Sequence, residues 1–265
     1  MLTGTFCCFQ GLGEAAERRL WERGCLTWRA FQQLRRPFFS AAKTQSVLRQ
    51  IGEAEVALRA RIADWFLNRL PPGQQIRVLP HFGGNTGYID IETTGLSSDD
   101  RITTVALYDG NQVTVFVEGR NLPELLAELS RFQLLVTFNG ARFDLPFLRH
   151  RFGIDLRTPH LDLLPVLRQL GFRGGQKQVE KRLGLPREAD EDGDGKEAVR
   201  LWQHYEEGDS ESLVRLARYN ARDAVNLARL AVEAYNRAVQ TYPMPVRLPL
   251  PPPLDLSFIR NALAL

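Results

Sequence analysis

Residues 88–96 read Tyr88-Ile89-Asp90-Ile91-Glu92-Thr93-Thr94-Gly95-Leu96, an apolar segment that carries two acids and ends at a glycine turn. The alternation predicts a β-strand, so Asp90 and Glu92, two positions apart, project from the same face of the sheet. An isolated pair of this kind is ordinarily solvated at the lip of a sheet. Two carboxylates on one face nevertheless repel one another unless a cation or another partner neutralises them.

Two later segments also end in an acid, and they read Phe138-Asn139-Gly140-Ala141-Arg142-Phe143-Asp144 and Tyr219-Asn220-Ala221-Arg222-Asp223. Asp144 follows a predicted buried strand, and it either binds a cation or N-caps the next helix. Tyr219 and Asp223 lie four residues apart in a predicted helix, where they share a face and by default form a surface pair. Because a divalent ion pair takes several oxygen ligands from different parts of a chain, the three segments together predict a metal site.

The pattern around these segments predicts three parts. Residues 1–72 form a helical module, with helices over 14–23, 28–34 and 41–70 and a possible break at Gly52. Residues 80–240 form an α/β domain with strands over 86–91, 102–108, 112–117 and 134–138, followed mainly by helices. Pro71-Pro72-Gly73 marks the boundary between them. Residues 241–265 form a Pro-rich tail, in which we expect Pro243–Pro253 to be an extended surface segment.

Taken in order, D-x-E-T-T-G-L, F-N-G-x-x-F-D and Y-N-x-x-D strongly resemble the motifs of the DEDD (DnaQ-like) 3′→5′ exonuclease superfamily. The tyrosine four residues before the last aspartate resembles its tyrosine subclass, and the chain is most similar to the YprB-like branch of predicted exonucleases. The resemblance covers residues 86–239. It implies a ribonuclease H-like α/β fold, a mixed sheet flanked by helices, and metal-dependent 3′→5′ hydrolysis of phosphodiester bonds in DNA or RNA.

The same resemblance implies a role for individual residues. Two Mg²⁺ or Mn²⁺ ions would be held by four acids: Asp90, Glu92, Asp144 and Asp223. Tyr219 would complete the catalytic set by orienting the attacking water. The 3′ end of the nucleic acid would contact six residues: Thr93, Thr94, Gly95, Leu96, Asn139 and Phe143.

Composition agrees with an enzyme of this kind without requiring one. A hydrophobic content of 44% and a charged content of 25% are those of a soluble globular protein. We expect no membrane association, because no apolar run approaches the ~20 residues of a membrane-spanning helix. Met1–Gly13 lacks Lys and Arg, so we expect no secretory signal. Cys7, Cys8 and Cys25 are odd in number and two are adjacent, which favours free thiols in a reducing cytoplasm.

Charge is distributed unevenly along the chain. Residues 1–75 carry eleven Lys/Arg and six Asp/Glu, a net charge of +5, which leaves −2 for the remainder of a chain whose net charge is +3. A basic module beside an acidic site suits phosphate contacts, but a solvated Arg-rich surface explains the charge equally well. Gly11-Leu12-Gly13 resembles the turn of a helix-hairpin-helix motif, and it either contacts DNA or packs against the rest of the protein.

Two further acidic segments have structural explanations. Asp162, in His160-Leu161-Asp162-Leu163, is about twice as well explained by a structural role at a strand or helix start as by an auxiliary role in the site. The segment 190–195 begins like a calcium loop, but Leu201 occupies its twelfth position, where a glutamate is required. We therefore interpret it as a solvated acidic loop.

Three functions compete on this basis. The first is a 3′→5′ exonuclease that acts on nucleic acid. The second is a nucleic-acid-binding module with a weak or inactive nuclease fold, which the presence of all five motif residues disfavours. The third, a structural adaptor with incidental acids, requires three independent coincidences. The motifs decide neither between DNA and RNA nor which proteins, if any, bind the chain.

Overall fold

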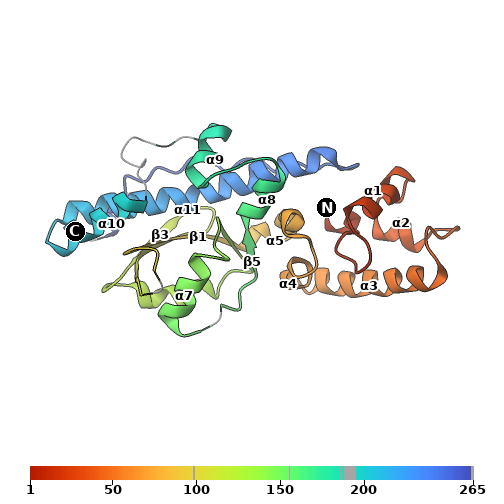
Figure 1. The fold of residues 1–265 in the computed structure, drawn as a ribbon, viewed down its shortest axis with the longest axis horizontal. Helices are drawn as coiled ribbons and strands as arrows, with labels where there is room; N and C mark the ends of the chain where they lie inside the picture. Colours follow the sequence, from red (N-terminus) through yellow and green to blue (C-terminus); the bar gives the residue numbers. More distant parts are fainter. Residues whose placement is uncertain (98, 155, 186, 188–194, 264–265) are drawn as a thin grey trace.

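A computed structural model of the chain describes residues 1–265 except 98, 155, 186, 188–194 and 264–265 (Figure 1). The predicted loop over 190–195 therefore lies almost entirely outside the described residues. Among the described residues, no helix is both long and apolar enough to cross a membrane. The molecule is elongated, with the first helices at one end and the sheet toward the other.

A five-stranded mixed sheet is the centre of the larger part of the molecule. Its strands are β1 (Thr86–Thr93), β2 (Ile102–Tyr108), β3 (Val113–Val117), β4 (Leu134–Thr137) and β5 (His160–Asp162), in the spatial order β3-β2-β1-β4-β5. The β1–β2 and β2–β3 pairs are antiparallel, while β1–β4 and β4–β5 are parallel. This arrangement confirms the predicted ribonuclease H-like α/β class. Strand β5, only three residues long, was not predicted.

Helices cover both faces of this sheet. The short elements are η4 (Leu122–Glu124), α6 (Leu125–Leu129), α7 (Asp144–Phe152), α8 (Leu163–Gln169), α9 (Gln176–Leu183), α10 (Gly195–Glu206), η6 (Val239–Thr241) and α12 (Ile259–Ala262), and the long one is α11 (Ser210–Ala238). Side chains from α6 and α7 bury one face together with Ile89 and Ile91 of β1. The opposite face, which includes Tyr88, packs against α11 (Figure 1). The alternation in β1 therefore decides which of its residues meet α11.

The helical module precedes the sheet. It contains η1 (Leu2–Gly4), α1 (Glu14–Glu22), α2 (Trp28–Gln32), α3 (Ala41–Arg59), α4 (Ala63–Leu67), η2 (Pro72–Val78), α5 (Leu79–Phe82) and η3 (Gly83–Asn85). Thr27 is the N-cap of α2, because its hydroxyl accepts a hydrogen bond from the Ala30 N–H. Leu12 is buried between the exposed Gly11 and Gly13, so this turn packs its leucine inward.

The predicted break at Gly52 is wrong. Helix α3 passes through Gly52 without interruption, because its buried face, which includes Val47 and Ile51, outweighs the cost of one interior glycine, about 1 kcal/mol. The helix instead ends near Arg61, a non-glycine residue at φ 55°. A left-handed residue at this place reverses the chain into α4, and no glycine or asparagine marks the position in the sequence.

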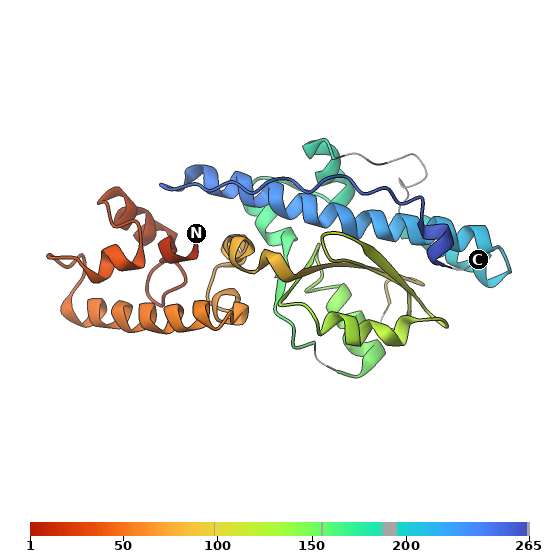
Figure 2. The same cartoon turned by 180° about the vertical axis from the view of Figure 1, so that it is seen from behind.

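Residues 245–256 of the tail have no regular secondary structure and run along α11, whereas the chain beyond them forms α12 and buries Ile259 (Figure 2). Side chains of α11 hold the backbone of the tail. The Asn236 amide exchanges two hydrogen bonds with the backbone of Leu248, while Arg229 and Arg222 donate to the carbonyls of Pro251 and Leu254.

A buried ion pair within the helical module is hydrogen-bonded to the segment that follows α11. Arg77 and Glu17 have exposed side-chain fractions of 2% and 1%, and their charged atoms lie 2.8 Å apart. The Arg77 guanidinium also donates to the hydroxyl of Tyr242, which follows α11. The Glu17 carboxylate accepts from the backbone N–H groups of Phe6 and Cys7. One charge pair thus connects three distant parts of the chain.

We predict that Glu17→Ala destabilises the protein by about 3–5 kcal/mol, because it removes the carboxylate that neutralises the buried Arg77 charge. Urea denaturation followed by circular dichroism measures the change. Glu128→Ala is the matched control: its ion pair with Arg131 is exposed, and its loss should change the free energy of unfolding by less than about 1 kcal/mol. Equal effects of the two substitutions would contradict the proposed importance of the buried pair.

Candidate active site

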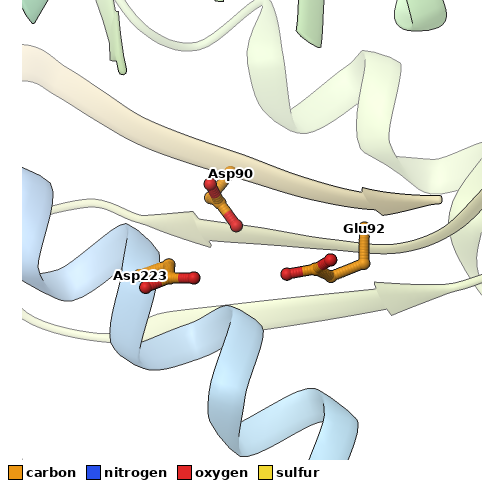
Figure 3. Close-up of side chains that lie close together, drawn as sticks. All are labelled: Asp90, Glu92 and Asp223. Atoms are coloured by element: carbon orange, nitrogen blue, oxygen red, sulfur yellow. The ribbon is translucent and has the colours of Figure 1, made fainter. Parts of the chain in front are cut away.

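Three acids from β1 and α11 converge on the face of the sheet that α11 covers. Asp90 and Glu92 alternate with Ile89 and Ile91, which face the other way. Asp223 reaches them from the middle of α11. Each of the three offers a carboxylate oxygen, and these oxygens lie within 4.8 Å of one another (Figure 3).

Asp144 lies beside this cluster but outside the group of oxygens within 4.8 Å. It is the first residue of α7 and only 3% exposed. The alternative in which Asp144 N-caps the helix is wrong: Phe143 occupies the N-cap position, and no side-chain capping bond is made there. The Asp144 carboxylate instead bonds to the backbone at Ile91, between Asp90 and Glu92. The structure thus brings Asp144 up to the same strand as the other acids.

Burial and repulsion from neighbouring acids raise the pKa values of the four candidate ligands, Asp90, Glu92, Asp144 and Asp223. Burial is the largest cause at Asp90 and Glu92, and the neighbouring charge of Asp223 adds to it at both. Burial raises the pKa of Asp144 to about 7, although backbone hydrogen bonds oppose the shift. The pKa of Asp223 also rises through burial, while Arg187 opposes the rise. A site of this kind favours protons or cations near neutral pH.

Asn220 fixes the orientation of Asp90. Its amide N–H donates to Asp90 Oδ2 at 2.7 Å and to the Asp90 carbonyl at 3.1 Å. Asn220 is fully buried, one turn from Asp223 on the same helix. It belongs to the segment Y-N-x-x-D, but sequence reasoning assigned it no role. Its polarity at a buried position of an amphipathic helix was the signal available.

Tyr219 lies near the same acids and contacts a lysine. Lys177 of α9 donates to the phenol oxygen at 2.5 Å, and its ammonium lies 3.8 Å from the centre of the ring. Burial, and then the charges of Asp223, Glu92 and Asp90, raise the pKa of Tyr219. The phenol therefore stays protonated at neutral pH and keeps an O–H to donate.

Two charged residues that sequence reasoning missed border Asp223. Arg187, which follows α9, forms ion pairs with both Asp223 and Glu180. Glu180 is 1% exposed, and its second oxygen accepts from Gln176. No local motif marks Arg187, because its partners lie 7 and 36 residues away.

The residues expected to contact a 3′ end lie in two turns, one that follows β1 and one that precedes α7. The turn after β1 is held by hydrogen bonds from Thr93 Oγ1 to the Gly95 carbonyl and from Thr94 Oγ1 to Asp100. A Cβ atom on Gly95 would meet the Asp100 carboxylate at 2.5 Å, so a larger residue would displace this carboxylate from its hydrogen bonds with Thr94 and Ser97. Leu96 is 86% exposed at the tip of the turn.

The second group of expected contacts is held by Asp162. Asn139 adopts φ 63°, and its N–H donates to Asp162 Oδ1 at 2.8 Å, while the Phe143 ring packs on Phe147. Asp162 also accepts from the N–H of Leu164 and caps α8. The structural explanation of Asp162 is therefore confirmed, because its carboxylate shapes the turn that leads to Asp144.

The donor set suits a hard divalent cation. Asp90, Glu92 and Asp223 offer only carboxylate oxygens, which Mg²⁺ and Mn²⁺ prefer. The three charges lie close together on a partly buried surface, where a dication would relieve the repulsion that raises their pKa values. These residues therefore fit a metal ion of the kind that the sequence predicts.

The chain matches a known protein family. Residues 87–235, more than half of the chain, match the family model of the RNase H superfamily. A search of curated proteins gives no match. Among solved structures, the chain is similar to the family B DNA polymerase from the hyperthermophilic archaeon Pyrobaculum calidifontis, with 16% identity and a TM-score of 0.46. That alignment covers 58% of this chain and only 24% of the polymerase, so the chain spans about a quarter of its length.

A second similar structure is Brucella melitensis NrnC. Its identity to this chain is 24%, and the TM-score is 0.40. The alignment covers 60% of this chain and 76% of NrnC.

We predict that Asp144→Asn stabilises the metal-free protein increasingly as the pH rises from 4 to 7. The folded-state pKa of Asp144 is raised from 3.8 to about 7, so the folded protein binds a proton that the unfolded chain has released. Wild-type stability must then fall with pH across this window, by at most about 4 kcal/mol from this residue. Denaturation in EDTA at several pH values tests this, and a pH-independent difference between the two proteins would contradict it.

Proposed function

Because this chain belongs to the RNase H superfamily, we propose that it is a metal-dependent 3′→5′ exonuclease of the DEDD type, tyrosine subclass, closest to the YprB-like branch. Its substrate is DNA or RNA, and its reaction is hydrolysis of a phosphodiester bond. The observation that carries the proposal is the convergence of Asp90, Glu92 and Asp223 on one face of the sheet, with Tyr219 one helical turn before Asp223.

Asp90, Glu92, Asp144 and Asp223 would hold two Mg²⁺ or Mn²⁺ ions. When bound, such ions make water a better nucleophile near neutral pH and stabilise charge on the leaving 3′-oxygen. The chain prepares the site for them before they bind. Asn220 fixes the orientation of Asp90, and the backbone bond to Ile91 holds Asp144 at the same strand.

Tyr219 supplies a hydrogen-bond donor for the attacking water. Its oxygen accepts from Lys177, so its own O–H is left to donate to a different group, which we propose is the attacking water. A general-base role does not suit a phenol whose pKa is raised by burial and by three neighbouring acids. Orientation of the water, rather than removal of its proton, is the role that these contacts support.

The turn at Thr93–Leu96 provides a place for the 3′ end. Leu96 is exposed in the turn that follows Glu92, and it would pack on the terminal base. Thr94 and Gly95 hold the turn that presents it. Asn139 and Phe143 border Asp144 and would contact the same terminal nucleotide.

We also propose that the three segments of the chain have different functions. Residues 80–240 carry the catalytic domain, and residues 1–72 add affinity for phosphates. Arg18, Arg19 and Arg23 are exposed on and after α1. Residues 241–265 hold α11 rather than bind substrate. The three cysteines are buried free thiols, and this supports the cytoplasm as the compartment.

The proposed function predicts cleavage of nucleic acid from its 3′ end. Single-stranded DNA and RNA labelled at either end should give a ladder that shortens from the 3′ end with Mn²⁺ or Mg²⁺ and not with EDTA. Asp90→Ala and Asp223→Ala should lower the rate by at least about 10³-fold while the protein stays folded, because each removes a charge that metal binding requires. If the wild-type protein binds the nucleic acid without cleaving it, the nucleic-acid-binding module is favoured. Cleavage at internal positions of the nucleic acid would favour an endonuclease.

The second prediction separates the role of the phenol from metal binding. Tyr219→Phe should lower kcat by about 10–100-fold, because the donor to the water is removed while the ring and the acids remain. Mn²⁺ affinity, measured by isothermal titration calorimetry, should stay unchanged. An unaltered kcat would refute the orienting role, whereas weaker Mn²⁺ binding would assign Tyr219 to the metal site.

The third prediction tests the helical module. Replacing Arg18, Arg19 and Arg23 by Gln should weaken nucleic-acid binding and lower the slope of log K against log salt by about one for each phosphate that the protein no longer neutralises. Arg131→Gln, outside the module, is the control. Substitution is preferable to deletion, because the module and α11 share one hydrophobic core. An unchanged slope of log K against log salt would mean that the module packs against the rest of the protein and does not contact phosphates.

A further inference from the structure

Arg187 occupies the side of Asp223 that faces α9. Its guanidinium donates to Asp223 Oδ1 and, from its Nε atom, to Glu180 Oε2 at 2.5 Å. The side chain of Arg187 is only 9% exposed, and those of Glu180 and Asp223 are 1% and 10% exposed. An arginine is therefore paired with one of the three carboxylates that converge to form the candidate metal site.

The position of Arg187 is defined by more than this one contact. Glu180 Oε1 accepts from Gln176 Nε2 at 2.9 Å while Oε2 holds Arg187, so both carboxylate oxygens are engaged. The same Gln176 amide donates to the Asp223 carbonyl at 2.9 Å. Helix α9 is thereby bonded to α11 at Asp223. Glu180 can keep hold of the guanidinium whether or not Asp223 does.

Charge distinguishes the two partners of Arg187. Glu180 lies outside the group of acids whose oxygens come within 4.8 Å of one another, and Asp223 lies inside it. A divalent cation among Asp90, Glu92 and Asp223 would repel a guanidinium on Asp223, because two positive groups would then share one carboxylate in a partly buried place. Arginine remains charged at any working pH, so it cannot relieve this repulsion by losing a proton.

We propose that Arg187 is an internal counter-cation for Asp223, which a divalent ion must displace when it binds, while Glu180 retains the guanidinium beside the site. The inference rests on the proposed metal-dependent function. In the metal-free protein Arg187 offsets the repulsion between the acids. On metal loading the Arg187–Asp223 pair breaks and the Arg187–Glu180 pair persists. Arg187 is thus a positioning residue that lowers the affinity of the site for metal.

An alternative role for Arg187 predicts the opposite change in metal affinity. If Arg187 only held Asp223 in a geometry that suits the metal, its removal would weaken metal binding. If the Arg187 guanidinium and a metal ion could bind Asp223 at the same time without repulsion, removal of Arg187 would leave the metal affinity unchanged. The sign of the change in metal affinity therefore decides between these roles.

The test is isothermal titration calorimetry of Mn²⁺ binding to the full chain without nucleic acid. Arg187→Gln should bind Mn²⁺ about tenfold more tightly than the wild-type protein, because a positive charge next to the site is removed. Arg182→Gln removes the same charge from the exposed surface of α9, and it should leave the affinity within about twofold. Weaker or unchanged binding by Arg187→Gln would overturn the proposal.

A double variant separates the contact from the net charge. Arg187→Gln alone leaves Glu180 buried and unpaired, which can destabilise the fold. Glu180→Gln combined with Arg187→Gln removes one charge of each sign and preserves an acceptor for Gln176. This double variant should still bind Mn²⁺ more tightly than wild type. Wild-type affinity in the folded double variant would show that only net charge matters, and the displacement would be refuted.

Thermal unfolding in EDTA and in saturating Mn²⁺ provides a second readout. Without metal, Arg187→Gln should melt below the wild-type protein, because the acids lose their counter-cation. The increase in Tm on adding Mn²⁺ should be larger in the variant. If neither protein binds Mn²⁺, the proposed function and this inference both fail. If the wild-type protein binds it and the variant binds no more tightly, this inference alone fails.

Discussion

Repulsion between buried carboxylates is the constraint around which this protein is organised. Asp90, Glu92 and Asp223 are brought within 4.8 Å of one another, although burial alone already disfavours their ionised forms. A fold can accommodate such a cluster only if the surrounding structure holds it in place. Here the sheet and α11 share an extensive apolar core, and Arg187 and Lys177 bring positive charge to the edge of the cluster.

Three of the acids are each held by a different neighbouring group. Asn220 orients Asp90, the backbone at Ile91 bonds to Asp144, and Arg187 pairs with Asp223. Asp162 acts one step further away by shaping the turn before Asp144. Such supports fix side chains whose charges would otherwise push them apart, and they explain why a site built on a strand and a helix is more sharply defined than one built on loops.

The sequence allowed prediction of the features that depend on local periodicity. Alternation placed Asp90 and Glu92 on one face, the four-residue spacing placed Tyr219 beside Asp223, and the strands predicted over 102–108 and 112–117 agree with β2 and β3. The features it did not allow depend on contacts across the fold. Strand β5 is too short to show the alternation of apolar and polar residues that predicts a strand. The partners of Asp144 and Arg187 lie at distant positions in the sequence. The end of α3 was misplaced because Arg61 adopts a conformation that its residue type does not indicate.

Helix α11 has a further consequence for how this chain can vary. It carries Tyr219, Asn220 and Asp223 near its middle, and just beyond its end Tyr242 bonds to Arg77 and Gln74 of the helical module. Each residue of an α-helix advances the rotation by about 100°. A single insertion or deletion between Asp223 and Ala238 would therefore turn the acid away from β1 or turn the far end away from the module. The spacing within α11 is consequently as constrained as the identity of its residues, and we expect length changes in related chains to fall in the loops on either side of it.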